Sequence, residues 1–321
     1  MVWRALKITK TTWYIGLGLI VGLAVAYYFF PVQGAKKTVE NELLLKQQTI
    51  AQAQAANIAS SFQNFGSAVS ALSKLPSVEA QDETTVEVME ALLAQQRERG
   101  LVSGVVITDK DGIVLFNSTT SGDPDTGADL SDRDYFVWAR ERRAQEGNYF
   151  IGRPVISRLG ASKDQVIVPV GSPIYADEEF HGMVVAAVPL EPLTTRYANL
   201  MHISDQTKIY LIDFKQELIY SSSSEELDLS YFADFDTTGE GHFSAGGNLI
   251  AYSPIVLGDQ NWVFVVVSPD TEVVEVAKGQ VSRLFLMFLL TAISIIFYGV
   301  VITRQKQPQP PQEDQERTSS T

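Results

Sequence analysis

Six side chains between positions 133 and 157 have the chemistry of a binding site for a small anion. They are two arginines, three aromatic residues and one serine: Arg133, Tyr135, Trp138, Tyr149, Arg153 and Ser157. A guanidinium group presents a planar fork of hydrogen-bond donors that matches a carboxylate in a bidentate pair. Aromatic rings supply flat apolar walls and, in tyrosine, a hydroxyl group. We therefore predict a ligand-binding site, with Arg133 as its principal contact.

Arg133 also has a structural alternative, because Asp132 and Asp134 flank it and either could form a salt bridge with it. Ser131 followed by Asp134 resembles a capping box, which predicts that Arg133 lies in the first turn of a helix. An anionic ligand at that position would also interact favourably with the helix dipole.

The other five residues have alternatives as well. Aromatic residues at this spacing can equally be part of a hydrophobic core. Arg153 and Ser157 fall on a predicted strand at an even separation, which directs both side chains to one face of a sheet, where they could converge with Arg133. Arg153 could instead lie in solvent.

No pattern indicates a metal site or a catalytic centre. Asp123, Asp125 and Asp129 alternate as calcium ligands do, but the glycine of a calcium loop is misplaced, so a solvated acidic loop is the alternative. The three histidines lack metal spacing and adjoin no nucleophile. The sequence has neither a phosphate-binding loop nor a dinucleotide fingerprint. We expect no enzyme activity, no metal and no cofactor.

The composition excludes further classes of function. A net charge of −13 over 321 residues provides no basic face for a phosphate backbone, so no nucleic-acid partner is expected. The chain has no cysteine, which excludes disulfides and thiolate chemistry. With 45% hydrophobic residues, it can build a sizeable core even when two membrane segments are set aside.

An uncharged apolar run at 13–30 is predicted to be the first transmembrane helix. At about 1.5 Å per residue it reaches roughly 27 Å, close to the thickness of a hydrocarbon core. Arg4, Lys7 and Lys10 precede it, and positive charge on that side places residues 1–12 in the cytoplasm. The alternative is a cleaved signal peptide, since Ala24-Val25-Ala26 resembles a cleavage site.

A second uncharged run, 284–302, is followed by Arg304 and Lys306 and is predicted to return the chain to the cytoplasm. The tail 303–321 is rich in proline and glutamine and is predicted to be disordered. The chain is therefore expected to be a two-pass protein of the plasma (inner) membrane, with both termini cytoplasmic and its folded region extracytoplasmic or periplasmic.

The region 31–99 begins with a long helix. Its apolar residues alternate by three and four positions, at Leu44, Ala51, Ala55, Ile58, Phe62, Phe65, Val69 and Leu72. This helix could be a signalling or dimerisation rod, or it could pack along its own domain. A second helix is predicted over 84–99, ending at Gly100.

The strand-rich remainder contains an internal repeat. Short segments match in the same order, namely 106–109 with 210–213, 116–118 with 220–222, and 172–174 with 253–255. The first pair begins a hairpin that turns through Asp111-Gly112. The shared order predicts two similar units, a membrane-distal one at 100–195 and a membrane-proximal one at 196–282.

Four segments of the distal unit carry a resemblance to a known family: SDRDYFVWARE, NYFIGRPVISR, VIVPVGSPIY and EFHGMVVAAVPLEPL. They resemble the double Cache family of extracytoplasmic sensor domains. The resemblance implies an α+β fold, in which a long N-terminal stalk helix carries two tandem PAS-like units and the distal unit holds a small-molecule ligand. It covers nearly the whole region between the predicted membrane helices.

The resemblance also bears on the ligand. Family pockets for amino acids resemble R-x-W-Y followed by P-Y-x-D, whose aspartate receives the ammonium group. This chain has Arg133 and Tyr135 at the first motif, but Pro154-Val155-Ile156-Ser157 at the second. With Tyr149 and Ser157 it is closer to the members that bind carboxylates.

We therefore expect a sensor subunit that binds a small organic anion in the distal unit and signals through its membrane helices. No output domain is recognised in the sequence, so the signal is expected to pass to a separate cytoplasmic or membrane partner, and a homodimer is possible. The alternatives are a structural or interaction module of a membrane complex that binds no ligand, and a truncated receptor.

Overall fold

The computed structural model describes the backbone of residues 10–305, with gaps at 98–100, 120–124, 143–148, 200–205, 214, 216, 224–227, 229, 231–238 and 259. Side-chain surroundings are described from Lys36 onward, with further gaps at 95–97, 198–199 and scattered positions after 271. Contacts divide the chain into a helical unit, Met1–Asn41 with Thr271–Thr321, and a sheet unit, Glu42–Asp270.

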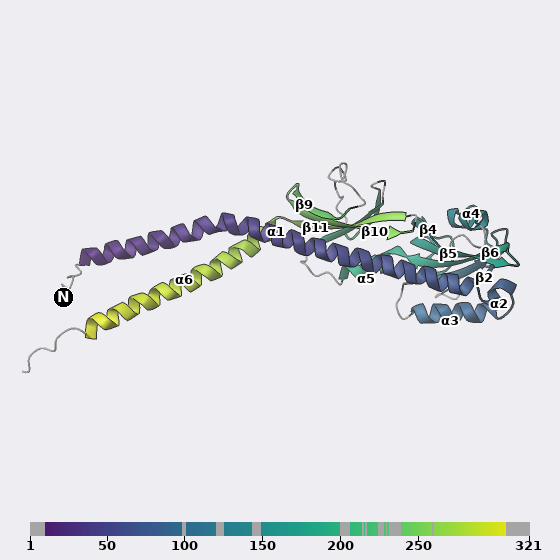
Figure 1. Ribbon diagram of the computed structural model, residues 1–321, viewed down its shortest axis with the longest axis horizontal. Coiled ribbons are helices and arrows are strands. Elements are labelled where there is room, and N and C mark those ends of the chain that lie inside the picture. Colours follow the sequence, from purple (N-terminus) through teal and green to yellow (C-terminus); the bar gives the residue numbers. More distant parts are fainter. Residues whose placement is uncertain are drawn as a thin grey trace, which may run out of the picture. The chain divides into compact units, whose positions relative to one another are not determined.

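The helical unit contains the first part of α1 (Lys10–Ser73) and α6 (Thr271–Gln305), the purple and yellow helices in Figure 1. Within the part of the chain that the structure describes, no helix has a stretch long and apolar enough to cross a membrane. The side chains of the predicted span 13–30 lie outside the described residues, as do several within 284–302. Residues 1–9 and 306–321, in the predicted cytoplasmic ends, also lie outside them.

The sheet unit contains two antiparallel sheets. The first has six strands, β1 (Gly104–Thr108), β2 (Val114–Thr119), β3 (Phe150–Ile151), β4 (Val155–Ile156), β5 (Val166–Ala176) and β6 (Glu179–Pro189), in the order β2-β1-β6-β5-β3, with β4 also paired to β5. The second has five, β7 (Lys208–Asp213), β8 (Leu218–Ser221), β9 (Gly241–Ala245), β10 (Asn248–Leu257) and β11 (Gln260–Pro269), in the order β8-β7-β11-β10-β9.

The two sheets have equivalent topology, since β1, β2, β6, β5 and β3 correspond to β7, β8, β11, β10 and β9. The hairpins that open them match in detail. The Asp109 carboxylate accepts hydrogen bonds from the backbone N–H groups two and four residues later, and so does the Asp213 carboxylate. These two residues are aligned in the sequence repeat. The repeated segments therefore form equivalent hairpins.

Helices connect and cover the strands of the sheet unit. They are α2 (Pro76–Ala80), α3 (Thr85–Arg97), α4 (Asp134–Glu141), α5 (Leu190–Asn199) and a single 3₁₀ turn, η1 (Gly160–Ser162). Helix α3 is the one predicted over 84–99, although Gly100 lies outside the described residues. Helix α5 follows β6 directly, and Tyr197 on it forms a hydrogen bond with Ser61 of α1.

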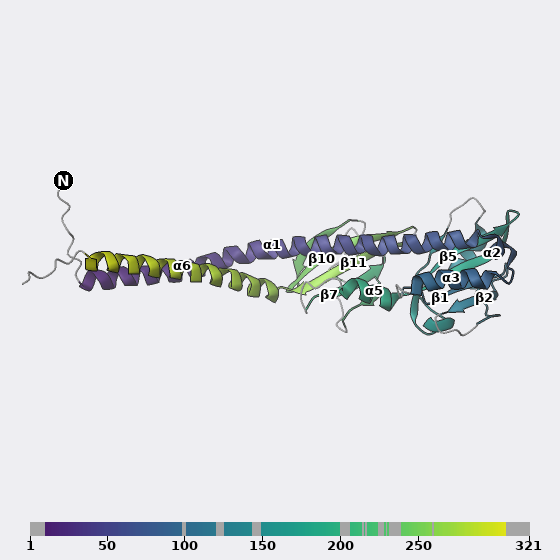
Figure 2. The ribbon, with the colours of Figure 1, turned by 90° about the horizontal axis from the view of Figure 1, so that it is seen from below.

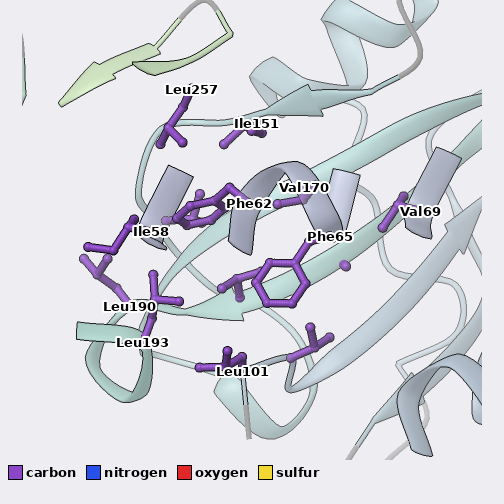
Figure 3. Close-up of a cluster of buried hydrophobic side chains, with 14 of the residues drawn as sticks. Ile58, Phe62, Phe65, Val69, Leu101, Ile151, Val170, Leu190, Leu193 and Leu257 are labelled. Carbon is purple, nitrogen blue, oxygen red and sulfur yellow. The ribbon is translucent and has the colours of Figure 1, made fainter. Parts of the chain in front are cut away.

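Helix α1 runs past both sheets (Figures 1 and 2) and is packed into the sheet unit. The alternating apolar positions predicted from the sequence are all buried, and Ile58 and Phe62 are completely inaccessible. The ring of Phe62 meets that of Trp262 edge-on at 5.6 Å. Figure 3 shows Ile58, Phe62 and Phe65 of this helix among side chains of the sheets and of α5. One apolar core thus joins α1 to both sheets.

The fold agrees with the expected class at the coarse level, which is a long N-terminal helix with two antiparallel sheets in a mixed α and β chain. Of the two alternatives for the long helix, packing along its own domain is observed for its part beyond Glu42.

Candidate ligand-binding site

A small cavity lies on one face of the first sheet. Its floor comes from β1, β2 and β6, and its cover is residues 155–161, here called the covering segment, which includes β4 and the start of η1. Leu130, Arg133 and Tyr135 close it from the connection that leads into α4. The cavity volume is about 40 Å³. Because one buried water molecule needs about 10–15 Å³ of cavity volume, the cavity suits a ligand of only a few non-hydrogen atoms.

Arg133 lies at the edge of this cavity, as the N-cap residue of α4. Its backbone is extended (φ −80°, ψ 137°), and its Nη2 donates a hydrogen bond to the Ile156 carbonyl at 3.2 Å. Its Nε is buried and has no hydrogen-bond partner among the described residues. One donor of the guanidinium thus ties α4 to the covering segment, and another remains unsatisfied.

The predicted capping box is wrong. Helix α4 begins at Asp134, so Arg133 precedes the first turn, and none of the described side chains caps the helix. The backbone N–H of Ser131 instead donates to the Asp129 carboxylate at 2.8 Å, which forms a local turn. The sequence signal was misleading because short polar side chains favour such turns as readily as helix caps.

Asp132 forms its salt bridge with Arg158, not with Arg133. The pair is bidentate, with Arg158 Nη1 and Nη2 at 2.9 and 2.8 Å from the two carboxylate oxygens, and both side chains are about half exposed. This hydrogen bonding lowers the pKa of Asp132. One of the two carboxylates that flank Arg133 in the sequence is therefore paired with another residue, and no salt bridge between Arg133 and Asp134 is found among the described residues.

Tyr135 lines the cavity from the first turn of α4 and is buried against Met183 and Val185 of β6. Burial raises the pKa of its hydroxyl to about 12, although the positive charge of Arg133 acts in the opposite direction. At neutral pH the group is an uncharged phenol, able to donate or accept a hydrogen bond at the cavity wall.

Ser157 also lines the cavity, but its hydroxyl is engaged within the covering segment. The Oγ donates to the Leu159 carbonyl at 2.9 Å and accepts from the Leu159 N–H at 3.3 Å. Ser157 therefore shapes the turn of the cover.

Arg153 is exposed and lines a separate, outer cavity of about 140 Å³, together with Arg133, Tyr135 and Arg158. The single strand predicted to carry Arg153 and Ser157 is interrupted, because β3 ends at Ile151 and β4 begins at Val155. The alternation argument for a common face does not apply here.

Trp138 and Tyr149 line neither cavity. The Trp138 ring packs against Phe150 with centroids 5.0 Å apart, and the Arg142 guanidinium lies 5.0 Å from the ring centroid. Tyr149 packs on α1 at Gly66, so closely that a Cβ at that glycine would lie 2.3 Å from the tyrosine ring. The structure thus brings Arg133, Tyr135 and Ser157 together at the inner cavity and places the other three outside it.

Asn117 and Arg158 are among the cavity residues that were not identified from the sequence. Asn117 lies on β2; its Nδ2 donates to Asp125 Oδ2 at 3.4 Å, while its Oδ1 is buried without a partner among the described residues. Asp125 also accepts from the Gly160 N–H, which links it to the covering segment. A polar amide on a strand of buried and half-buried residues was the available signal for Asn117.

The predicted acidic loop contributes no metal site within the described residues. No cluster of three metal-binding side chains is found among them. Asp125 and Asp129 are both engaged with backbone N–H groups, and Asp123 lies outside the described residues.

The charged side chains that line the cavity are arginines, of which Arg158 is paired with Asp132. Among the described residues that line it, two are arginines and none is acidic. Its remaining walls are valine, leucine, isoleucine, alanine and glycine, with a few neutral polar groups. Burial between apolar walls strengthens a guanidinium–carboxylate pair relative to the same pair in water.

Comparisons with known proteins agree with this architecture. A family model described as a Cache domain matches residues 35–277. The sensory domain of a Campylobacter jejuni chemoreceptor, solved with isoleucine bound, has a TM-score of 0.54 at 15% identity and covers 75% of this chain and 98% of its own. A Vibrio parahaemolyticus domain assigned to the sensory box/GGDEF family gives 0.55 at 15% identity, covering 72% and 99%.

The extracellular domain of a protein assigned as a histidine kinase is also similar, with a TM-score of 0.55 at 15% identity and coverage of 76% and 96%. No curated protein matches the sequence. At these identities the solved structures support the fold alone, whereas the family model covers most of the chain. The double Cache resemblance is thus confirmed, and the chain belongs to the Cache domain family of sensory domains.

Proposed function

We propose that this chain is a membrane-anchored extracytoplasmic sensor subunit that binds a small organic anion in the cavity of the first sheet. The observation that carries the proposal is that Arg133, which lines that cavity, has a buried Nε with no hydrogen-bond partner among the described residues. A buried donor without an acceptor costs free energy, and an anionic ligand would provide the missing acceptor. Asp132 cannot serve this role while it is paired with Arg158.

The favoured ligand is a carboxylate without an ammonium group. The chemoreceptor from Campylobacter jejuni is described with isoleucine bound, but an ammonium group needs acceptors and preferably a negative charge. The described residues that line the cavity include no acidic side chain. This agrees with the absence of an aspartate at Ser157, where the amino-acid motif of the family would have one.

Anchoring would come from the two uncharged runs 13–30 and 284–302. Basic residues before the first and after the second favour cytoplasmic termini and an extracytoplasmic sheet unit in the plasma (inner) membrane. An accessible tag or protease site near Asp213 tests this topology. Modification by impermeant reagents from outside intact cells is expected, and accessibility only from the cytosolic side would overturn it.

Signalling would depend on the apolar core that α1 shares with both sheets. Because α1 packs against both sheets, a ligand that favours one arrangement of the first sheet would shift the position of α1. A ligand shifts such an equilibrium only by its difference in affinity for the two states. We propose that this shift passes along the helices to a signalling partner.

Thermal unfolding of the full chain with a panel of small carboxylates tests the ligand proposal. A ligand at 100 times its Kd is expected to stabilise the folded state by about 2.7 kcal/mol. Arg133→Ala should abolish the stabilisation, whereas Arg196→Ala on α5 is a matched control that should retain it. No stabilisation by any carboxylate, or equal stabilisation of the Arg133→Ala variant, would contradict the proposal.

A second function is a structural or interaction module that binds no ligand. The cavity volume of only about 40 Å³ favours it, since side chains of the chain itself occupy most of the site. Purification with one fixed partner, in the same yield with and without carboxylates, would support this alternative.

A further inference from the structure

Two residues that line the inner cavity each have a buried polar atom, and the two atoms are of opposite hydrogen-bonding type. Arg133 Nε can only donate a hydrogen bond and Asn117 Oδ1 can only accept one, and both residues line the same cavity. Each atom lacks a partner among the described residues. A ligand that satisfies both must therefore carry an acceptor and a donor.

The orientation of the Asn117 amide is fixed by its neighbour. Its Nδ2 donates to Asp125 Oδ2, and only an N–H group can donate to a carboxylate, so the Oδ1 is the amide atom that has no partner among the described residues. Asp125 is in turn held by the Gly160 N–H of the covering segment. The acceptor is thus positioned by a hydrogen-bond network that includes the cover.

The donor group of the ligand should be uncharged. An ammonium group would place a positive charge in a cavity that two arginines border, and the described lining residues include no carboxylate to offset it. A hydroxyl group donates one hydrogen bond and carries no charge. The small volume restricts the molecule further, to one of a few non-hydrogen atoms.

We propose that the anion of this site is a short hydroxycarboxylate, whose carboxylate accepts a hydrogen bond from Arg133 Nε and whose hydroxyl donates to Asn117 Oδ1. This rests on the proposed function, because it specifies the ligand class of the same cavity. Asn117 is then the residue that selects for the hydroxyl group. A site built to bind a hydroxyl rejects the analogue that lacks it, because its own polar group is left unpaired.

The test compares four molecules of nearly equal size on the full chain: lactate, propionate, alanine and lactamide. They differ only in the hydroxyl group, its replacement by an ammonium group, or the loss of the carboxylate charge. Lactate is expected to bind about tenfold more tightly than propionate, because propionate leaves Asn117 Oδ1 unpaired. Alanine and lactamide should bind more weakly still. Isothermal titration calorimetry measures each Kd.

Two substitutions assign the selectivity to Asn117. In Asn117→Leu, which has similar volume and no acceptor, the ratio of the lactate and propionate Kd values should fall to about one. In Asn117→Asp, the added negative charge should weaken the binding of lactate and strengthen the binding of alanine. Asn248→Leu on β10 is a matched control, and it should leave every ratio unchanged. If the Asn117 variants fail to fold, the analogue series on the unaltered chain decides alone.

The outcomes of these experiments distinguish the selection of a hydroxycarboxylate from the proposed anion-binding function. Equal binding of lactate and propionate overturns the hydroxyl selection and leaves an anion sensor. Preferential binding of alanine overturns the uncharged donor. If no carboxylate in the panel binds, or if Arg133→Ala binds them unchanged, both the hydroxycarboxylate and the anion-binding function are overturned.

Discussion

The two sheets of this protein have one topology, yet they differ at the position where the opening hairpin of the first sheet borders a cavity. At equivalent positions of the two opening hairpins, Val106 pairs with Asn117 and Tyr210 pairs with Ser221. Val106 borders the cavity, whereas Tyr210 is 2% exposed in an apolar cluster with Tyr252. A large ring thus fills the second sheet at the position where the first sheet leaves space.

The polar residues that pair with Tyr210 and Val106, which are Ser221 and Asn117, also differ between the two sheets. Ser221 forms a local turn, in which its Oγ donates to the Ser223 carbonyl and accepts from the Ser223 N–H. Asn117, which lines the cavity, has a buried Oδ1 that finds no hydrogen-bond partner in the described part of the chain. The two sheets therefore share a fold, and a few side chains decide whether the equivalent position is filled or is available to a ligand.

The largest expected effect comes from opening the filled sheet. Tyr210→Val removes a buried ring and should lower the free energy of unfolding by about 3 kcal/mol, as large-to-small core substitutions do. Urea denaturation measures the loss. Tyr210→Phe is the control, because it keeps the ring and separates the contribution of the hydroxyl group. A loss below about 1 kcal/mol would mean that the second sheet is as loosely filled as the first.

The reciprocal change fills the first sheet. Val106→Tyr introduces a ring where the cavity lies, so carboxylate binding should weaken at least thirtyfold, or about 2 kcal/mol. Calorimetric titration with lactate measures the change, and Val105→Ile on the opposite face of β1 is a control that should leave it intact. Retained affinity in Val106→Tyr would place the ligand outside this cavity.

The features that could be predicted from the sequence are those set by local pattern. The buried stripe of α1 follows from alternating steps of three and four, since residues at that spacing share a helix face. The hairpin repeat aligns without gaps, so Asp109 and Asp213 fall at equivalent turns. Arg133 was selected because its neighbours resemble a family motif, and its contact with a ligand stays a prediction.

The features that were missed depend on contacts between distant residues. Arg158 pairs with Asp132 across 26 positions, and Tyr149 packs on α1 at Gly66. No local pattern specifies such partners. The break between β3 and β4 was nevertheless signalled by Pro154, since proline cannot donate to a strand ladder.

The buried hydroxyl group of Tyr135 should make the stability of the protein depend on pH in the alkaline range. Its pKa is raised to about 12 by burial, so the unfolded chain, with a tyrosine pKa near 10, deprotonates first. The stability from this group is fully present below pH 10 and is lost as the pH rises toward 12. The free energy of unfolding of the unaltered chain should fall between pH 8 and 11. In Tyr135→Phe this fall should be smaller by roughly 1 kcal/mol. An identical fall in both proteins would show that the hydroxyl is solvated.

The smallest expected effect concerns the charge balance at Arg133. In the present arrangement Arg158 holds Asp132 in a bidentate pair, so the Asp132 carboxylate forms no hydrogen bond with Arg133. Arg158→Gln would release Asp132, whose carboxylate then competes for Arg133, and carboxylate binding should weaken about threefold. The double variant Arg158→Gln/Asp132→Asn removes the competitor and should recover the original Kd. If the double variant binds as weakly as the single one, Arg158 contacts the anion directly, and the difference between the two sheets includes a second ligand-binding arginine.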